Sequence, residues 1–273
     1  MTVSMRPKYL FKVPVNARNI SPDAFASQTI DKIKKFEVWE GNKKRTLGEL
    51  FEITGESGET PKETSIQVTG DLRRVKRIGE AMTEGEITIE GNVGMHLGEK
   101  MKGGTITVTG DVGSWLGAMM KGGTITVKGN VGDYVGAAYR GSMKGMMGGA
   151  IIIYGNAGNE VGCFMRKGLI KIYGSAGQFV GIHMHNGTIF VQGDTEGRAG
   201  ASIIDGKIVI LGNAASVLPS FTFDDVKKKV KVDGEEILGP FYSFTGDLVE
   251  KGNGKLYVAK AKNQHLDFYE KYL

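Results

Sequence analysis

One eight-residue motif recurs along most of this chain of 273 residues. Its copies read ITIEGNVG (87–94), ITVTGDVG (106–113), ITVKGNVG (125–132), IIIYGNAG (151–158) and IKIYGSAG (170–177), and weaker ones begin at Ile66, Ile189 and Ile208. From Gly91 onward, the first glycine of each copy follows the previous one by 19 residues, except for a step of 26 between Gly129 and Gly155. A fixed period of this kind indicates a repeat protein, in which each unit buries its apolar face by stacking on its neighbours.

Each copy alternates apolar and polar residues, which predicts a half-buried strand. The residue four positions before the turn glycine is always isoleucine, and the residue two positions before it is always valine or isoleucine. Such β-branched columns are typical of the inward side chains of stacked strands. The sequence therefore predicts an all-β protein, a right-handed parallel β-helix of about eight coils with period 19 and caps at both ends. A hexapeptide period, which would indicate a left-handed β-helix, and the LxxLxL pattern of leucine-rich repeats are both missing.

The turn after the strand reads Gly-Asn or Gly-Asp in most copies. Glycine adopts positive φ without strain, and asparagine and aspartate tolerate left-handed backbone better than other residues. We therefore expect this pair to turn the same corner of every coil through left-handed backbone.

The composition favours a cytoplasmic protein. Cys163 is the one cysteine, which excludes an internal disulfide and favours a reducing compartment. The chain has no apolar run of membrane-spanning length and no signal-peptide core, so we expect neither membrane insertion nor export. The net charge of +5 is spread along the chain without a nucleic-acid motif, so we expect no nucleic-acid partner.

Three regions follow from the repeat: an N-terminal cap segment (1–65), the β-helix (66–215), and a C-terminal cap or docking tail (216–273). In the first region we expect a strand over Tyr9–Val15, a short helix after Ser21, a hairpin turning at Gly41, and a capping box from Thr46 to Glu49. In the last region we expect strands over Val226–Val232 and Leu256–Ala259, a turn at Asp233-Gly234 and a helix over Asn263–Leu273.

Two columns follow the second corner glycine. The first is mostly methionine and predicts an inward stack: Met101, Met120, Tyr139, Met165, Met184 and Ile203. The next position forms a basic column: Lys102, Lys121, Arg140, Arg166 and His185. Like charges about 5 Å apart repel, so these side chains are expected to extend into solvent or to meet an acidic partner. The 26-residue step adds residues within Arg140–Gly149, where exposed Met143, Met146 and Met147 suggest a protein contact.

The outward column becomes apolar toward the later coils. Thr88, Thr107 and Thr126 are followed by Ile152, Lys171, Phe190 and Val209, and the next outward column contains Tyr154, Tyr173 and Leu211. An apolar face of this size is normally covered. We expect either the C-terminal tail or another subunit to cover it, and Ile152, Tyr154, Tyr173 and Phe190 are our candidate partner-facing residues beside the basic column.

No catalytic, cofactor-binding or metal-binding residue is predicted in this chain. His183 and His185 would share a face if they lay in a strand, but further metal ligands at recognisable spacing are missing. Cys163 occupies a column of alanines, where cysteine serves as a small apolar filler.

The repeated pattern G-[ND]-[VA]-G-x-x-[VL]-G at Gly91–Gly98, Gly110–Gly117 and Gly129–Gly136 resembles the GXGXG β-helix family. Two of its branches are the C-terminal domain of the glutamate synthase large subunit and the C subunit of formylmethanofuran dehydrogenase. The stretch VWEGNKKRTLGELFEITG (38–55) is similar to the entry segment of the second branch. The lysine- and isoleucine-rich composition favours an archaeal origin.

This resemblance implies a structural, non-catalytic subunit of an oxidoreductase complex that reduces CO2 with methanofuran to formylmethanofuran in the first step of methanogenesis. Other subunits would carry the molybdopterin with molybdenum or tungsten, the iron–sulfur clusters and the zinc-type hydrolase site. The alternatives are a glutamate-synthase-type β-helix subunit and the C subunit of a formyltransferase/hydrolase complex. A further hypothesis is that the basic column holds a carboxylate-rich ligand such as the glutamyl tail of methanofuran.

Overall fold

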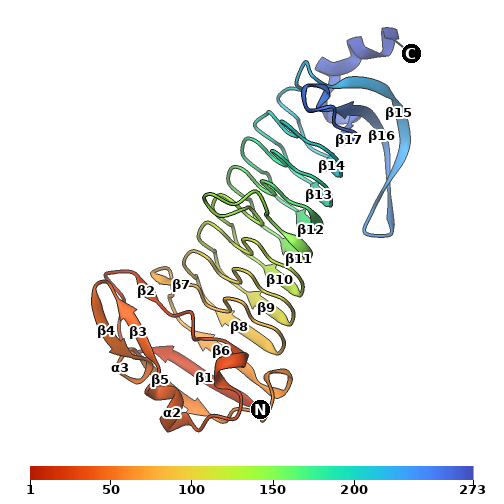
Figure 1. Ribbon diagram of the computed structural model, residues 1–273. Coiled ribbons are helices and arrows are strands. Elements are labelled where there is room, and N and C mark those ends of the chain that lie inside the picture. The colour runs from red at the N-terminus through yellow and green to blue at the C-terminus, as the bar shows by residue number, and fades with distance from the viewer. Residues whose placement is uncertain (273) are drawn as a thin grey trace.

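A computed structural model describes residues 1–272 of the chain, which form an elongated stack of coils with a cap at each end (Figure 1). The stack is built by one column of parallel strands in register. These strands are β6 (Ser65–Thr69), β8 (Glu86–Glu90), β9 (Thr105–Val108), β10 (Thr124–Val127), β11 (Met147–Ile153), β12 (Lys167–Ile172), β13 (Thr188–Val191) and β14 (Lys207–Ile210). A second line of parallel bridges, from Leu72 through Val93 to Ala214, joins the coils on another side. The parallel stacking is thus as predicted, and the right-handed sense of the winding stays a prediction.

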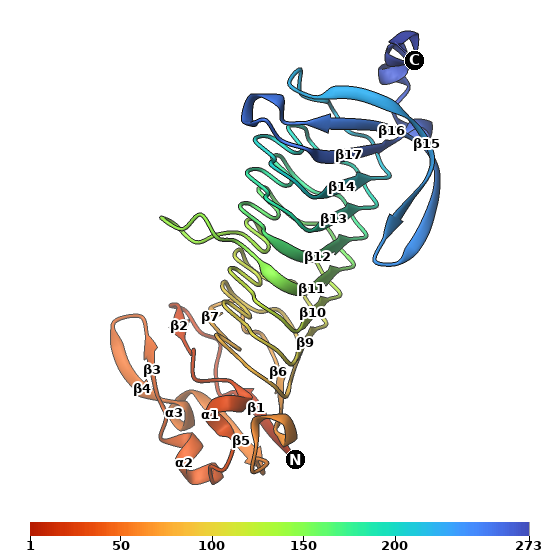
Figure 2. The same cartoon turned by 45° about the vertical axis from the view of Figure 1, so that its right-hand side comes forward.

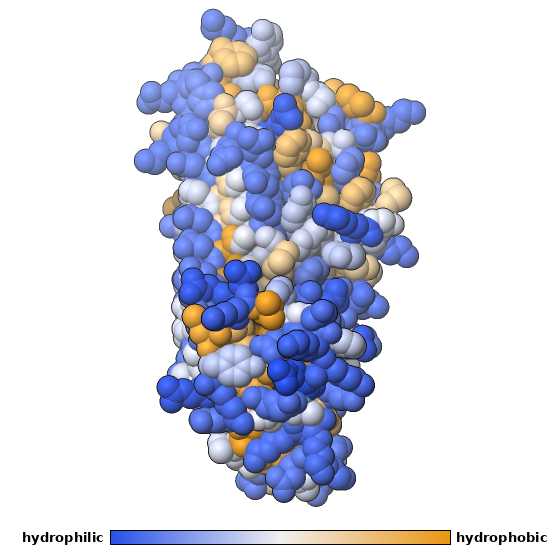
Figure 3. Space-filling view, turned by 90° about the vertical axis from the view of Figure 1, so that its left-hand side faces the viewer, coloured by the Kyte–Doolittle hydropathy of each residue, from blue (hydrophilic) through white to orange (hydrophobic). Residues whose placement is uncertain are grey.

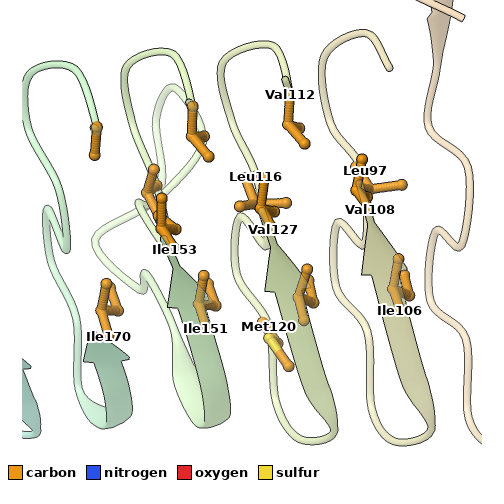
Figure 4. Packing of buried hydrophobic residues seen from close by; sticks show 14 of the residues in the cluster. Leu97, Ile106, Val108, Val112, Leu116, Met120, Val127, Ile151, Ile153 and Ile170 are labelled. Atoms are coloured by element: carbon orange, nitrogen blue, oxygen red, sulfur yellow. The ribbon is translucent and has the colours of Figure 1, made fainter. Parts of the chain in front are cut away.

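The predicted inward columns form the core. Every isoleucine of the first column and every valine or isoleucine of the second is at most 1% exposed. Each pairs with its counterpart one coil away, as Ile106 does with Ile125 and Ile125 with Ile151. Figure 4 shows Ile106 on β9, Ile151 on β11 and Ile170 on β12 in one line, with Met120 of the methionine column nearby. Because each inward residue packs on a residue of the same kind one coil away, the core is continuous from coil to coil.

The expected left-handed backbone at the Gly-Asn and Gly-Asp turns is wrong for most copies, because only Gly70 and Gly91 of their glycines have positive φ and none of the Asn and Asp residues does. Their side chains instead accept hydrogen bonds from the next coil: the Asp111 N–H donates to Asn92 Oδ1 (2.8 Å), and the Asn130 N–H donates to Asp111 Oδ1 (2.7 Å). The ladder continues through Asn156 and on to Asn213. The turn glycine is needed for space, because a Cβ on Gly110 would lie 2.6 Å from the backbone of Gly91.

This ladder of hydrogen bonds between the turns of successive coils makes a contribution to stability that can be measured. Asn130→Ala removes the acceptor of the Asn156 N–H (2.9 Å), and we expect unfolding to become easier by about 1 kcal/mol, the net contribution of one hydrogen bond. Denaturant unfolding measures the change. Asn42→Ala is the control, since the Asn42 side chain makes no hydrogen bond within residues 1–272. Equal stability of the two variants would contradict a contribution from the ladder.

The N-terminal region closes one end of the stack. Strand β1 (Thr2–Pro7) pairs in parallel with β6 and antiparallel with β5 (Phe51–Gly55), so the first coil has no free strand edge. The expected strand over Tyr9–Val15 is wrong: only β2 (Val15–Asn16) forms there, between β3 (Glu37–Glu40) and β7 (Val75–Lys76). The chain between β1 and β2 crosses from one sheet to the other, which a continuous strand cannot do.

The other expected N-terminal elements are confirmed. Ser21 caps α1 (Pro22–Phe25), and the hairpin of β3 and β4 (Lys43–Thr46) turns at Gly41. Thr46 and Glu49 form the capping box of α3 (Leu47–Leu50). The remaining short helices are α2 (Ile30–Lys34) and the 3₁₀ turn η1 (Pro61–Glu63).

The C-terminal region closes the other end and folds back along the stack. Strand β17 (Gly254–Ala259) pairs in parallel with β14, and a long hairpin of β15 (Thr222–Val232) and β16 (Glu235–Gly246) continues the sheet, turning at Asp233-Gly234 as predicted (Figure 1). Strand β16 was not predicted. Three 3₁₀ segments complete the chain: η2 (Leu248–Glu250), η3 (Lys260–Lys262) and η4 (Gln264–Tyr272). The expected C-terminal helix is thus present as 3₁₀, and its last residue lies outside the described residues.

The hairpin covers the apolar outward face of the last coils. Phe190 and Val209 pack with Val230, Val232 and Phe241 in a second core. Phe190 is therefore buried against this chain's own hairpin, and its assignment as a partner-facing residue is wrong. The C-terminal tail thus covers the face at β13 and β14.

None of the helices formed by residues 1–272 is long and apolar enough to cross a membrane.

Candidate interaction surface

The predicted basic column is interrupted at the insertion. Four of the five members donate their backbone N–H to a methionine carbonyl of the preceding coil, as Lys121 does to Met101 (2.7 Å) and Arg166 to Met146 (2.8 Å). In the inserted coil this position belongs to Met147, whose N–H donates to the Met120 carbonyl (2.6 Å). Arg140 therefore lies outside the column, whereas Lys102, Lys121, Arg166 and His185 occupy it. The binding of a carboxylate-rich ligand by this column stays a prediction.

The methionine column shows the same correction. Met146 is fully buried and takes the inward position, with its methyl group beneath Gly168. Tyr139, the expected member, is 38% exposed. The prediction that Met146 is exposed is therefore wrong, while that for Met143 is confirmed. The insertion lies between the corner glycine and the methionine column, so counting from Gly136 reaches the loop and misses the core residue.

The second corner of the coils carries a column of outward residues that sequence reasoning missed. Its members have φ between +56° and +70° although none is glycine: Arg77, His96, Trp115, Tyr134, Glu160, Phe179 and Arg198. Left-handed backbone costs a residue with a Cβ about 1 kcal/mol, so seven such residues in line mark a built feature. Each stands two positions before the second corner glycine. The column was not predicted because charged and aromatic residues are mixed in it and no residue type dominates.

Three side chains of this column, His96, Trp115 and Tyr134, form an aromatic ladder together with Tyr139 at the start of the insertion. The Trp115 ring stacks on Tyr134 with centroids 4.3 Å apart and lies parallel to His96 at 5.9 Å. Tyr139 stands edge-on to both His96 (5.4 Å) and Trp115 (5.2 Å). The ladder therefore fixes the root of the insertion against two preceding coils.

A buried carboxylate supports the first ring of the ladder. The Glu99 side chain is 2% exposed, and its Oε2 lies 3.0 Å from both His96 Nδ1 and Arg77 Nη1. Arg77 also pairs with Glu80 (3.2 Å), and Lys100 lies 3.4 Å from the other Glu99 oxygen. Burial alone would raise the pKa of Glu99, but the His96 contact and the charges of Arg77, His96 and Lys100 outweigh it and lower that pKa. Glu99 is thus held as a carboxylate.

An aromatic patch remains on the outward face beyond the reach of the hairpin. Tyr154 (48% exposed) and Tyr173 (39%) stack with centroids 5.1 Å apart, and Ile152 is half-buried beside them. The Lys128 ammonium lies 3.7 Å from the Tyr154 ring centroid. The hairpin ends close by, where Lys171 pairs with Asp233 (3.1 Å). These rings are available to a partner, and their assignment as partner-facing stays a prediction.

The histidine pair and the cysteine lie in packed positions of the coils. His183 lies in left-handed backbone and stacks on Phe164 (4.6 Å), so the expected shared strand face with His185 is wrong. Burial and the Glu160 carboxylate raise the pKa of the Cys163 thiol to about 12, in keeping with an inert filler. Within residues 1–272, no three His, Cys, Asp or Glu side chains lie close enough together to hold a metal ion.

One face of the molecule is mostly hydrophilic, with several small apolar patches in place of one large one (Figure 3). One depression runs along the turn residues of three successive coils, from Asn156 to Asp194, and is open to solvent. An open depression of this kind suits contact with another macromolecule better than enclosure of a small substrate.

No family model matches the chain. The C subunit of the molybdenum-containing formylmethanofuran dehydrogenase 1 from Methanosarcina barkeri is 44% identical over 95 residues, which are 35% of this chain and 32% of that relative. The C subunit of the tungsten-containing formylmethanofuran dehydrogenase 2 from Methanothermobacter wolfeii is 43% identical over 95 residues, 35% of each chain. The matched part spans about a third of the length of these curated relatives.

A solved structure is similar along nearly the whole chain. A chain in the formyltransferase/hydrolase complex from Methylorubrum extorquens, whose structure was determined with methylofuran bound, superimposes with a TM-score of 0.84 at 30% identity. The match covers 94% of this chain and 99% of that one. The chain therefore belongs to the same protein family as that component of the formyltransferase/hydrolase complex, and over about a third of its length it is homologous to the C subunits of formylmethanofuran dehydrogenases.

Proposed function

We propose that the chain is a structural, non-catalytic subunit of a formylmethanofuran dehydrogenase complex, which reduces CO2 with methanofuran to formylmethanofuran. The observation that carries the proposal is the homology to the C subunits of such enzymes, together with a whole-chain match to a component of a related complex. In this proposal the chain is a right-handed parallel β-helix of about eight coils, and other subunits hold the molybdopterin, the iron–sulfur clusters and the zinc-type hydrolase site.

The surface supports a scaffold role. The column of parallel strands is continued at both ends by strands of the caps, so neither β6 nor β14 has a free edge. Its sides present the aromatic ladder, the basic column and the patch of Tyr154 and Tyr173, which lie on separate parts of the coils. Aromatic side chains and arginine are enriched at protein interfaces.

Affinity purification of the tagged full chain from its native cells tests this proposal. We expect the eluate to contain a molybdopterin-type subunit, an amidohydrolase-like subunit and ferredoxin-like chains, with molybdenum or tungsten by metal analysis. Recovery of the chain alone, or with glutamate synthase subunits, would reject the proposal.

A second candidate is a subunit of a formyltransferase/hydrolase complex, favoured by the match along 99% of that complex's chain. The same purification separates the two. A formyltransferase/hydrolase complex would give a formyltransferase subunit and a hydrolase subunit without molybdenum, tungsten or CO2-reducing activity in the eluate.

A further inference from the structure

The insertion ends in a projecting tip, Arg140–Lys144, between β10 and β11 (Figure 2). Both ends of this tip are fixed. On one side, the Tyr139 ring lies against His96 and Trp115. On the other side, the Gly145 N–H donates to the carbonyl of Phe164 (2.9 Å), and the chain then re-enters the core. The tip is therefore a braced element, and little conformational entropy is lost when it binds.

The tip exposes one large apolar side chain, that of Met143, to solvent. The Arg166 guanidinium donates to the Met143 carbonyl through Nη2 (3.1 Å), while the Met143 side chain stays 64% exposed. An exposed methionine on a fixed backbone gains from burial in a partner, and its flexible thioether adapts to the shape of a pocket.

The surroundings of Met143 are cationic. Arg140, Lys144, Arg166 and Lys167 lie in or beside the tip, and none of them has a carboxylate partner within 4.0 Å among the described residues. Burial, the Arg166 charge and His183 together lower the pKa of the neighbouring His185. Charge complementarity therefore favours an acidic surface as the partner of this region.

We propose that the tip docks on another protein subunit of the same assembly, at an acidic surface with an apolar depression that receives Met143. This inference rests on the proposed function. A nucleic acid is also acidic, but the Tyr139 ring is held in the aromatic ladder and the tip offers no free ring on which a base can stack. The exposed methionine therefore favours a protein.

Cross-linking in the intact complex tests the contact directly. A photo-reactive phenylalanine analogue replaces Met143 in the full chain, and the same analogue replaces Leu10, which is 68% exposed at the far end of the rod, as a control. We expect position 143 to give one product that joins this chain to one other subunit at a peptide rich in Asp and Glu, and position 10 to give a different product or none. A product with nucleic acid, or no product at position 143, would overturn the inference.

Charge reversal provides a second readout. We expect Arg140→Glu with Lys144→Glu to weaken retention of that subunit at least about tenfold at low salt, and the difference to shrink as salt is raised. Lys12→Glu with Lys62→Glu is the control, because it changes the net charge equally at positions elsewhere on the surface. Equal retention by both double variants would overturn the inference. If the unmodified chain retains other subunits but position 143 does not cross-link, only this inference fails; if it retains none, the proposed function fails with it.

Discussion

Glu99→Ala is expected to destabilise the fold by about 3 kcal/mol. Removing one member of a buried ion pair leaves the other charges uncompensated, which typically costs about 3–5 kcal/mol. The lower end applies here because Glu80 still holds Arg77 at 3.2 Å, whereas His96, with 9% of its side chain exposed, loses its carboxylate. Denaturant unfolding measures the change.

A control variant and the pH dependence separate the charge of Glu99 from its packing. Glu99→Gln keeps the shape and should cost less. Because the pKa of Glu99 is lowered in the folded chain, its stabilisation is complete above the ordinary value of 4.5 and is lost as the pH falls through the folded value. The stability difference between wild type and Glu99→Gln should therefore shrink below about pH 4.5. A difference that is constant with pH would show that the carboxylate charge contributes nothing.

Gly117→Ala is the second large effect, and we again expect a loss of about 3 kcal/mol. Gly117 has φ +59°, where a Cβ costs about 1 kcal/mol. That Cβ would also lie 2.5 Å from Ile151 Cδ1, an overlap in a close-packed core worth about 2 kcal/mol. Thermal or denaturant unfolding checks the sum.

Gly141→Ala serves as the matched control for this variant. It has φ +80° but nothing within 4 Å of the added Cβ, so only the backbone term of about 1 kcal/mol should appear. Adding Ile151→Val to Gly117→Ala removes the clashing methyl group and should restore part of the lost stability. Equal losses in both alanine variants, or no relief from Ile151→Val, would show that the close contact is not the cause.

The sequence predicts the core well because its signal is repeated. A β-branched column that recurs eight times at fixed spacing from a glycine has few explanations other than stacked strands, and the register of Ile125 on Ile106 is as expected. The prediction failed where the count crossed an insertion. Only packing beneath Gly168 shows that Met146, and not Tyr139, continues the inward column.

Contacts between segments that are distant in the chain could not be predicted from the sequence. Phe190 looks like a partner contact until the hairpin of β15 and β16 folds over it, and β16 itself is hidden by the Gly239-Pro240 pair in its middle, which argues against a strand. The buried Glu99 cluster was missed because it unites residues from different coils whose columns contain unlike side chains. Repetition made the core columns predictable and local capping signals predicted the N-terminal helices α1 and α3, whereas contacts between distant segments left no such signal in the sequence.

The register of the parallel strands makes the rod a length standard. Neighbouring strands lie about 4.8 Å apart, so the span from β6 to β14 is fixed at roughly 34 Å by the number of coils. Removing residues 105–123, one whole period, would leave every column aligned and bring the two caps closer by about 4.8 Å. The distance between any partners bound to the two ends therefore changes in steps of one coil. The number of coils sets this distance without altering the residues that bind the partners.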